Sequence, residues 1–291
     1  MSIAFKVRKF WAMPARFKYI AVAQRLRRAF PRLPVPIRLP FGAWWLAENS
    51  ALDFNLSTIG FENAEIRFVD RFLKPGMTVL DVGAHHGLYT LLASKRVGHS
   101  GKVFAFEPSP RERRRLVRHL RFNSCSNVQV EAYALGSSQT LADLFLSVGI
   151  NDWCNSLRRQ AAGGDSQAVQ VDVLPLDDYL AKSGLERVDF IKLDVEGGER
   201  DVLRGAEKLL KWRSRPVIFA EVQDVRTSPW GYPAKEIIDH LQQRNYKWFK
   251  IETDGRLQAL DVSTSKFDGN FVACPEERIG ELLPLVRTFD R

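Results

Sequence analysis

The sequence predicts an α/β fold in which helices cover both faces of a mostly parallel, doubly wound sheet. From Thr78 onward, short apolar runs alternate with stretches of helical periodicity, which is the pattern of βα units. The first run leads into a turn with two glycines, Gly83 and Gly87. An acid stands at the end of three predicted strands: Asp81, Glu107 and Asp194. Because ligands bind beyond the carboxyl ends of strands in such sheets, we expect the functional site there.

The predicted elements follow one another without an internal repeat. We expect core strands at 78–83, 102–107, 128–134, 188–194 and 216–222, and helices at 87–97, 110–122, 199–211 and 234–244. The runs 246–250 and 270–274 close the sheet as an antiparallel pair, which makes seven strands with an antiparallel edge strand. The segment between 137 and 175 is less regular, and its runs 141–148 and 168–174 predict an added β-ribbon.

The start of one helix is marked unusually clearly. Ser109 has the side chain of a helix N-cap, Pro110 occupies the first helical position, and Glu112 follows three residues after the cap. This pattern predicts a capping box. It also places Glu107 at the carboxyl end of a strand, just before the helix begins.

The chain divides by charge into a basic arm, residues 1–47, and a body, residues 48–291. The arm holds ten of the 43 basic residues and no acid, so the body keeps 33 basic residues against 34 acidic ones and is close to neutral. Four prolines within 31–40 favour an extended linker over packed structure. We therefore expect one folded domain over 48–291, preceded by the arm.

The arm interleaves its basic residues with aromatic ones such as Phe5, Trp11 and Phe17. This composition suits anionic lipid headgroups and predicts a peripheral membrane contact. A nucleic-acid backbone is the least favoured partner of this composition. Because Pro14 interrupts the amphipathic pattern, a third interpretation is favoured over a helix lying on a membrane: a partly disordered tail, or a helix that packs on its own domain or on a second subunit. No oligomeric state is predicted.

Composition also excludes several classes of protein. No apolar run reaches about 18 residues, so a transmembrane helix is not expected. The N-terminus lacks the apolar segment and cleavage site of a signal peptide. The cysteines, Cys125, Cys154 and Cys274, are scattered and form no CxxC pair, which favours a reducing compartment. We expect a cytoplasmic protein, with membrane contact only through the arm.

The turn and the next acid together predict a nucleoside ligand. Glu107 lies 20 residues beyond Gly87, the interval at which an acid commonly binds a ribose diol. Dinucleotide sites favour GxGxxG, whereas this turn reads Asp81-x-Gly83-x-x-x-Gly87, so a nicotinamide-dependent oxidoreductase is disfavoured. A carboxylate at the strand end suits a ligand with ammonium and sulfonium charges, such as S-adenosyl-L-methionine. An ordinary tight turn is the alternative.

Several segments resemble the FkbM family of S-adenosylmethionine-dependent methyltransferases. They are FLKPGMTVLDVGAHHGLYTLLA, VFAFEPSP, AYALG and VDFIKLDVEGGERDVLRGAEKLL, of which IKLDVEGGE is the most specific. The resemblance runs from about Glu62 to Cys274 and excludes the arm. It implies a class I methyltransferase (Rossmann-like) fold. It also implies transfer of a methyl group to a hydroxyl oxygen of a small molecule, sugar, lipid or polyketide-like acceptor.

The resemblance also implies which residues bind the cofactor. By position these are Asp81, Gly83, Ala84, His85, Gly87, Glu107, Ala134, Leu135 and Asp194. Asp81, Gly83 and Gly87 would line the methionine part, and Glu107 would bind the ribose. Ala134 and Leu135 would lie near the adenine. The family commonly has Asn where this chain has His85, so a contact by that side chain departs from the family pattern.

Asp194 and Glu196 are the candidate catalytic residues, because methyl transfer to an alcohol needs an acceptor for the hydroxyl proton. A carboxylate serves as a general base directly, or it holds a divalent cation that acidifies the hydroxyl. With Glu221 these residues form an oxygen-rich set that would suit Mg²⁺ better than zinc. The simpler alternative is that Glu196 and Glu199 cap the following helix.

The remaining candidates carry weaker signals. His85 and His86 lack a nearby cysteine or a spaced third histidine, so a zinc site is not expected and a role in shaping the pocket is preferred. The acceptor pocket is predicted from the irregular segments, whose polar and aromatic members are Asn151, Trp153, Trp230 and Tyr232. The alternative to an enzyme is a catalytically silent nucleoside-fold module that uses its basic arm to bind a membrane or nucleic acid.

Overall fold

The computed structural model describes residues 34–48, 52, 53, 56, 62–147, 154–159 and 166–287. The chain separates into two units, residues 1–61 and 62–291, and each is described by itself.

The described part of the first unit contains an antiparallel hairpin, in which β1 (Val35–Arg38) pairs with β2 (Trp44–Ala47). The extended linker predicted for 31–40 is therefore wrong over β1. Proline has no N–H to donate to a neighbouring strand, so it is usually confined to edge strands. Pro36 is compatible with β1 because this strand pairs on one side only, within a two-stranded sheet. The rest of the predicted arm, residues 1–33, lies outside the described residues.

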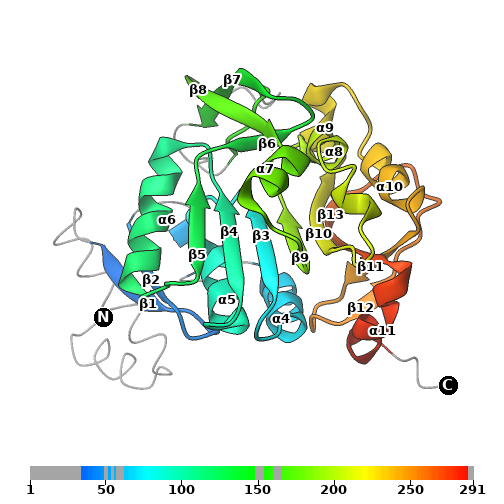
Figure 1. Cartoon of the computed structure of the whole chain (residues 1–291), viewed down its shortest axis with the longest axis horizontal. Helices are drawn as coiled ribbons and strands as arrows, with labels where there is room; N and C mark the ends of the chain where they lie inside the picture. The colour runs from blue at the N-terminus through cyan, green and yellow to red at the C-terminus, as the bar shows by residue number, and fades with distance from the viewer. Residues whose placement is uncertain are drawn as a thin grey trace, which may run out of the picture. The chain divides into compact units, whose positions relative to one another are not determined.

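The second unit is built on an eight-stranded sheet with the order β12-β11-β13-β10-β9-β3-β4-β5 (Figure 1). Its strands are β3 (Thr78–Val82), β4 (Lys102–Phe106), β5 (Val128–Glu131), β9 (Phe190–Leu193), β10 (Val217–Gln223), β11 (Tyr246–Ile251), β12 (Leu257–Ala259) and β13 (Asp268–Pro275). The strands from β10 to β5 are parallel, which confirms the mostly parallel α/β sheet. The order reverses at β3, which lies between β4 and β9, so the topological switch point is the gap between β3 and β9.

The predicted count of seven strands is wrong, whereas an antiparallel edge strand is present, since β12 at the edge pairs antiparallel with β11. The three-residue β12 adds an eighth strand at the edge, and it is too short to give a periodic signal. The antiparallel strand next to the parallel set is β13, which lies inside the sheet between β10 and β11. The antiparallel pairing of 246–250 with 270–274 is confirmed as the pair β11 and β13.

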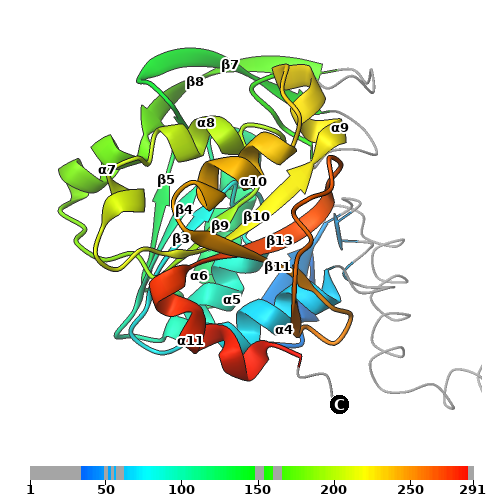
Figure 2. The ribbon, with the colours of Figure 1, turned by 90° about the vertical axis from the view of Figure 1, so that its right-hand side faces the viewer.

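Helices cover both faces of the sheet (Figure 2). The helices α4 (Asn63–Phe72), α5 (Leu88–Val97) and α6 (Pro110–Phe122) lie on one face, and α7 (Leu176–Ser183), α8 (Glu199–Arg204) and α10 (Lys235–Gln242) lie on the other. Shorter helical segments are η2 (Leu209–Lys211), α9 (Asp224–Thr227), η3 (Ser228–Trp230), η4 (Glu276–Arg278), α11 (Ile279–Leu282) and η5 (Leu283–Leu285). Within the described part of the chain, no helix is long and apolar enough to span a membrane.

The two faces of the central strands differ in chemistry. Toward α7, α8 and α10, strand residues such as Leu80 and Ile191 join one continuous apolar core. Toward α4 and α5, Asp81 of β3 stands in register with Lys192 of β9, which is itself in register with Phe219 of β10. This second face therefore carries charged side chains into the interior.

A second, three-stranded sheet follows β5. It has the order β6-β8-β7, with β6 (Ala134–Gly136), β7 (Thr140–Ser147) and β8 (Ser166–Pro175), and it lies beyond one end of the main sheet in both views (Figures 1 and 2). The predicted ribbon is thus confirmed. The single strand predicted over 128–134 is wrong, since β5 ends at Glu131 and Ala134 already belongs to β6.

The helix predicted over 199–211 breaks after Arg204. A Cβ atom on Gly205 would lie 2.0 Å from the carbonyl oxygen of Gly136 in β6. The chain therefore bends at a glycine that lets α8 approach the second sheet closely, and it resumes as the short η2.

Candidate active site

The turn after β3 contains residues with left-handed backbone conformations at alternate positions. Gly83, His85 and Gly87 have φ values of 81°, 50° and 93°, and only His85 among them carries a side chain. A Cβ atom on Gly83 would lie 1.8 Å from the carbonyl oxygen of Asp194. The turn after β3 and the chain after β9 therefore meet backbone to backbone at the switch point, where a glycine is the residue that fits.

Glu107, at the end of β4, holds this turn in place. Its Oε2 accepts the backbone N–H of His85 at 2.7 Å, and its Oε1 accepts that of Ser109 at 2.8 Å. The side chain is buried, and burial raises the pKa of Glu107 to about 8. Each carboxylate oxygen has a second lone pair, so the group still has acceptor capacity for hydroxyl groups of a ligand.

The capping pattern at Ser109 was predicted correctly in position and wrongly in detail. The helix α6 begins at Pro110 as expected. The Ser109 hydroxyl bonds the Glu112 carboxylate rather than a backbone N–H, and the Ser109 N–H donates to Glu107 instead of Glu112. In a capping box, the Ser109 N–H would donate to Glu112 within the helix. Here it donates to Glu107, which precedes the helix.

Asp81 lies beneath the turn rather than at its surface. Only 1% of the residue is exposed, and its Oδ2 accepts the hydroxyl of Thr90 at 2.5 Å. Its Oδ1 is buried without a hydrogen-bond partner among the described residues. Burial raises the pKa of Asp81. The neighbouring Ala84 is also buried, so neither side chain presents an open surface to a ligand in this conformation.

Ala134 and Leu135 begin β6, shortly after the chain leaves β5. The Glu107 N–H donates to the carbonyl oxygen of Glu131 at 3.0 Å, so the end of β5 lies beside the carboxylate expected to bind ribose. Leu135 packs in the main core and Ala134 in the small core of the second sheet. Their proximity to an adenine ring stays a prediction.

Asp194 follows β9 directly and stands at the switch point. Its backbone N–H bonds Val82 of β3 at 3.1 Å, and its Oδ2 accepts the ammonium of Lys192 at 2.7 Å. The side chain is 27% exposed. Unlike Asp81, it is therefore a carboxylate that a bound acceptor can reach.

Glu196 lies two residues further on, in a constrained turn. Its φ of 56° is left-handed, which is uncommon for a residue with a side chain and is found most often where surrounding contacts enforce it. Those contacts are the Ser156 hydroxyl and the Trp230 indole, which donate to its carbonyl oxygen at 2.9 Å and 3.2 Å. Its carboxylate forms an ion pair with Nε of Arg226 at 3.0 Å.

Three of the predicted carboxylates come together. Asp194, Glu196 and Glu221, the last from β10, each offer a ligand oxygen within 4.8 Å of the others. Burial, followed by repulsion from Asp194, raises the pKa of Glu196 to about 8 and raises that of Glu221 well above its usual value. Among the described residues, Lys192 and Arg226 are the cations paired with members of this group.

The alternative in which Glu196 and Glu199 cap α8 is half right. The buried Glu199 accepts the backbone N–H groups of Val195 and Gly197 at 2.9 Å and 3.2 Å, so it holds the turn before the helix. Glu196 instead faces Arg226. The two glutamates therefore have different roles, one structural and one at the carboxylate cluster.

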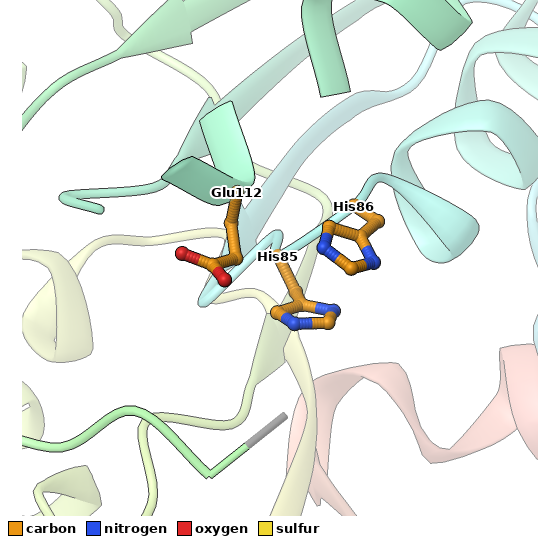
Figure 3. A group of neighbouring side chains, drawn as sticks. All are labelled: His85, His86 and Glu112. Atoms are coloured by element: carbon orange, nitrogen blue, oxygen red, sulfur yellow. The ribbon is translucent and has the colours of Figure 1, made fainter. Parts of the chain in front are cut away.

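The paired histidines form a second group with Glu112, in which ligand atoms lie within 4.8 Å of one another (Figure 3). The ring centroids of His85 and His86 lie 3.8 Å apart, and the ring planes are tilted by 32°. Ring lone pairs lie in the ring planes, so two rings that lie face to face at this tilt do not converge well on one ion. Glu112 is already bonded by Ser109 and by Arg111 at 2.5 Å. The arrangement fits a packed lining of the turn better than a metal site.

The predicted aromatic residues of the acceptor pocket are only partly described. Asn151 and Trp153 lie outside the described residues. Trp230 packs on the DVEGG turn, where a Cβ on Gly198 would lie 2.9 Å from its ring, and the guanidinium of Arg158 lies 5.0 Å from its ring centroid. Tyr232 is buried and its hydroxyl donates to the carbonyl oxygen of Gly197. Both aromatics thus support the turn.

Two functional candidates were missed in the sequence. Lys192 could have been found, because it is a charged residue in the otherwise apolar strand FIKL. Arg226 could not, because α9 is four residues long and carries no periodic signal. It reaches Glu196 only because the end of β10 folds back over the DVEGG turn: a Cβ on Gly197 would lie 2.1 Å from the Arg226 carbonyl oxygen.

A family model described as "Methyltransferase FkbM domain" matches residues 81–248. The match covers more than half of the chain and contains the turn after β3, Glu107 and the carboxylate cluster.

Named relatives agree with this match. The 31-O-demethyl-FK506 methyltransferase FkbM of Streptomyces tacrolimicus is 30% identical over 65% of this chain and 82% of its own length. The 2-O-methyltransferase NoeI of Sinorhizobium fredii is 28% identical over 58% of this chain and 72% of its own. The AMB antimetabolite synthetase AmbE of Pseudomonas aeruginosa is 28% identical over 65% of this chain, which spans only 10% of that protein.

Proposed function

The chain belongs to the FkbM family of S-adenosylmethionine-dependent methyltransferases, and on this premise we propose that it methylates a hydroxyl oxygen. The acceptor class that we propose is a sugar, lipid or polyketide-like small molecule. The observation that carries the proposal is the position of Asp194, whose backbone meets the turn after β3 at the switch point of the sheet and whose carboxylate is partly exposed.

The described residues fit S-adenosyl-L-methionine. The turn at Gly83 and Gly87 brings backbone close to the switch point, and Glu107 beside it offers acceptor lone pairs suited to a ribose diol. The strand order, with an antiparallel β13 inserted between β10 and β11, supports a class I methyltransferase fold. When bound, the cofactor supplies an electrophilic methyl group on a sulfonium sulfur.

The chain's own contribution is to orient the acceptor and to take its proton. Lys192 occupies Oδ2 of Asp194, which leaves Oδ1 to accept the hydroxyl proton as the oxygen becomes methylated. Glu196 is less suited to this step, because its carboxylate is already paired with Arg226 and burial raises its pKa. In its protonated form it would donate a hydrogen bond to the acceptor instead.

We further propose that the carboxylate cluster works with a proton rather than with Mg²⁺. Lys192 pairs with Asp194 and Arg226 pairs with Glu196, so cations of the chain itself offset part of the negative charge of the cluster. The raised pKa values of Glu196 and Glu221 are consistent with a proton retained within the cluster. The three oxygens would also suit a hard divalent cation, so chelation provides a direct comparison.

Transfer of a labelled methyl group into an extract of the native host, followed by mass spectrometry, tests the proposed function. We expect a labelled product whose methyl group survives mild alkali, as a methyl ether does. Release of labelled methanol would show a carboxyl acceptor and would contradict the proposal. Tight binding of S-adenosylhomocysteine without any transfer would favour the silent binding module.

The arm is tested separately, because residues 1–33 lie outside the described part of the chain. We propose that it contacts an anionic membrane surface, on the basis of its composition alone. Sedimentation with anionic liposomes should be lost when residues 1–40 are removed. Retained sedimentation would exclude the arm as the anchor, and binding to oligonucleotides instead would favour nucleic acid.

A further inference from the structure

We propose that Lys192 is a positioning residue for catalysis: it fixes the Asp194 carboxylate and ties it to Asp81 beneath the cofactor turn. The inference rests on the proposed function, in which Asp194 accepts the hydroxyl proton. It extends that function by assigning the part of the site that holds the base in place.

Lys192 occupies an unusual position for a lysine. It lies in the four-residue strand β9, flanked in register by Asp81 on β3 and by Phe219 on β10, and only 7% of it is exposed. An isolated ammonium in the interior of a sheet costs several kcal/mol, so it needs close anionic partners. An apolar residue would satisfy the packing of this strand without them.

The partners come from different elements. The ammonium donates to Oδ2 of Asp194 at 2.7 Å and lies 5.2 Å from the ring centroid of Tyr89 on α5. The Tyr89 hydroxyl donates in turn to the carboxylate of Glu62, at the start of α4, at 2.6 Å. Burial alone would lower the pKa of Lys192, but Asp194, Asp81 and Glu62 together raise it above its usual value. The ammonium is therefore a permanent charge.

The surrounding acids share this single ammonium. Burial raises the pKa of Glu62 to about 7 and also raises that of Asp81. The positive charge of the ammonium also acts on two groups beyond the strand end. It disfavours the charged form of His85 and favours the charged form of Glu196. Asp194 is the acid that the ammonium contacts directly and that also reaches solvent. Lys192 thus selects which carboxylate is held at the surface of the site.

Removing the ammonium should therefore disturb Asp194. The carboxylate would lose the donor that fixes its rotamer at the switch point. A misplaced base lowers the rate of the chemical step. Binding of S-adenosylhomocysteine should change less, since Lys192 makes no contact with Glu107 or with the turn itself among the described residues.

Lys192→Met and Lys192→Arg test this inference through kcat, KM and the affinity for S-adenosylhomocysteine. We expect Lys192→Met to lower kcat at pH 7 by about 100-fold or more, with KM and the affinity changed much less. Lys192→Arg keeps a donor toward Asp194 and should recover part of kcat. An unchanged kcat in Lys192→Met, or a loss confined to KM and affinity, would overturn the inference.

A double-mutant cycle keeps the inference testable even if Lys192→Met alone folds poorly. In the double variant, Asp194→Asn removes one of the negative charges that the Lys192 ammonium balances. If Lys192 acts through Asp194, adding Lys192→Met to Asp194→Asn should change kcat less than threefold. Losses that multiply would contradict the inference. The matched control is Lys250→Met, which removes a surface ion pair with Glu252 at 2.9 Å and should leave kcat unchanged.

The cycle also separates this inference from the proposed function. Full activity in Asp194→Asn would remove Asp194 as the base and with it the role of Lys192, while methyl transfer to a hydroxyl would stand. An inactive Asp194→Asn together with a wild-type kcat in Lys192→Met would remove the role of Lys192 alone.

Discussion

The backbone N–H of His85 donates to Oε2 of Glu107 at 2.7 Å, so the turn after β3 and the acid at the end of β4 form one unit. The other oxygen of the same carboxylate holds the first residue before α6, Ser109. Glu107 therefore fixes the shape of the cofactor turn as well as offering acceptors to a ligand. A change at this residue should be seen first in ligand binding.

Glu107→Gln is expected to weaken S-adenosylhomocysteine binding about 10- to 100-fold, because a hydrogen bond to a charged group contributes about 1.5–3 kcal/mol. Isothermal titration calorimetry measures the change. The matched control is Glu186→Gln, an exposed residue in the loop before β9, which should bind like the wild type. A Glu107→Gln affinity within twofold of the wild type would remove the ribose assignment.

The same residue predicts a pH dependence of binding. The pKa of Glu107 is about 8 in the unliganded protein, and ribose hydroxyls bind its ionised form better, so binding should release a proton. The affinity for S-adenosylhomocysteine should rise about tenfold between pH 7 and pH 9 and then level off. Calorimetry in buffers of different ionisation enthalpy measures the released proton. Proton uptake, or an affinity that falls with pH, would contradict this reasoning.

The features that the sequence predicted best are those with local signals. The β-strands that carry Asp81 and Glu107 were found because apolar runs alternate with helical periodicity, and Ser109 and Pro110 marked the start of α6. The convergence of Asp194 with Gly83 followed from the rule that ligand sites form at the carboxyl ends of strands. These inferences needed only nearest neighbours in the chain and the geometry of a parallel sheet.

Gly83→Ala should be strongly destabilising. A left-handed φ costs an alanine about 1–2 kcal/mol, and its Cβ would also lie 1.8 Å from the Asp194 carbonyl oxygen, so backbone must move. Gly184→Ala is the matched control, since Gly184 has φ of 64° and open space around it. Chemical denaturation should show a loss for Gly83→Ala that exceeds the control by at least about 2 kcal/mol. Equal losses would mean that the two strand ends do not meet as described.

Activity should not depend on added divalent cations. Within the cluster of Asp194, Glu196 and Glu221, Asp194 is already paired with Lys192 and Glu196 with Arg226, and the raised pKa values of Glu196 and Glu221 favour a retained proton. Initial rates after treatment with EDTA, with and without added Mg²⁺, measure this dependence. Rates that fall after chelation and return with Mg²⁺ would instead assign the cluster as a metal site.

The features that the sequence did not predict depend on contacts between distant segments. The pairing of Arg226 with Glu196 exists because the chain after β10 folds back over the DVEGG turn, and nothing in a four-residue helix indicates that path. The helices α4 and α7 were not predicted either, although they are as long as the predicted helices α5 and α10. Glu199 was assigned to capping, but only the tertiary turn reveals that it bonds Val195 and Gly197.

The kcat of Asp194→Asn, measured at saturating S-adenosyl-L-methionine, tests directly whether Asp194 is the general base. We predict a fall in kcat of about 10²- to 10⁴-fold, the usual effect of losing a general base. The control is Asp201→Asn on α8, whose side chain is equally exposed at 27% and which should keep full activity. An Asp194→Asn enzyme that transfers methyl groups at the wild-type rate would contradict the account.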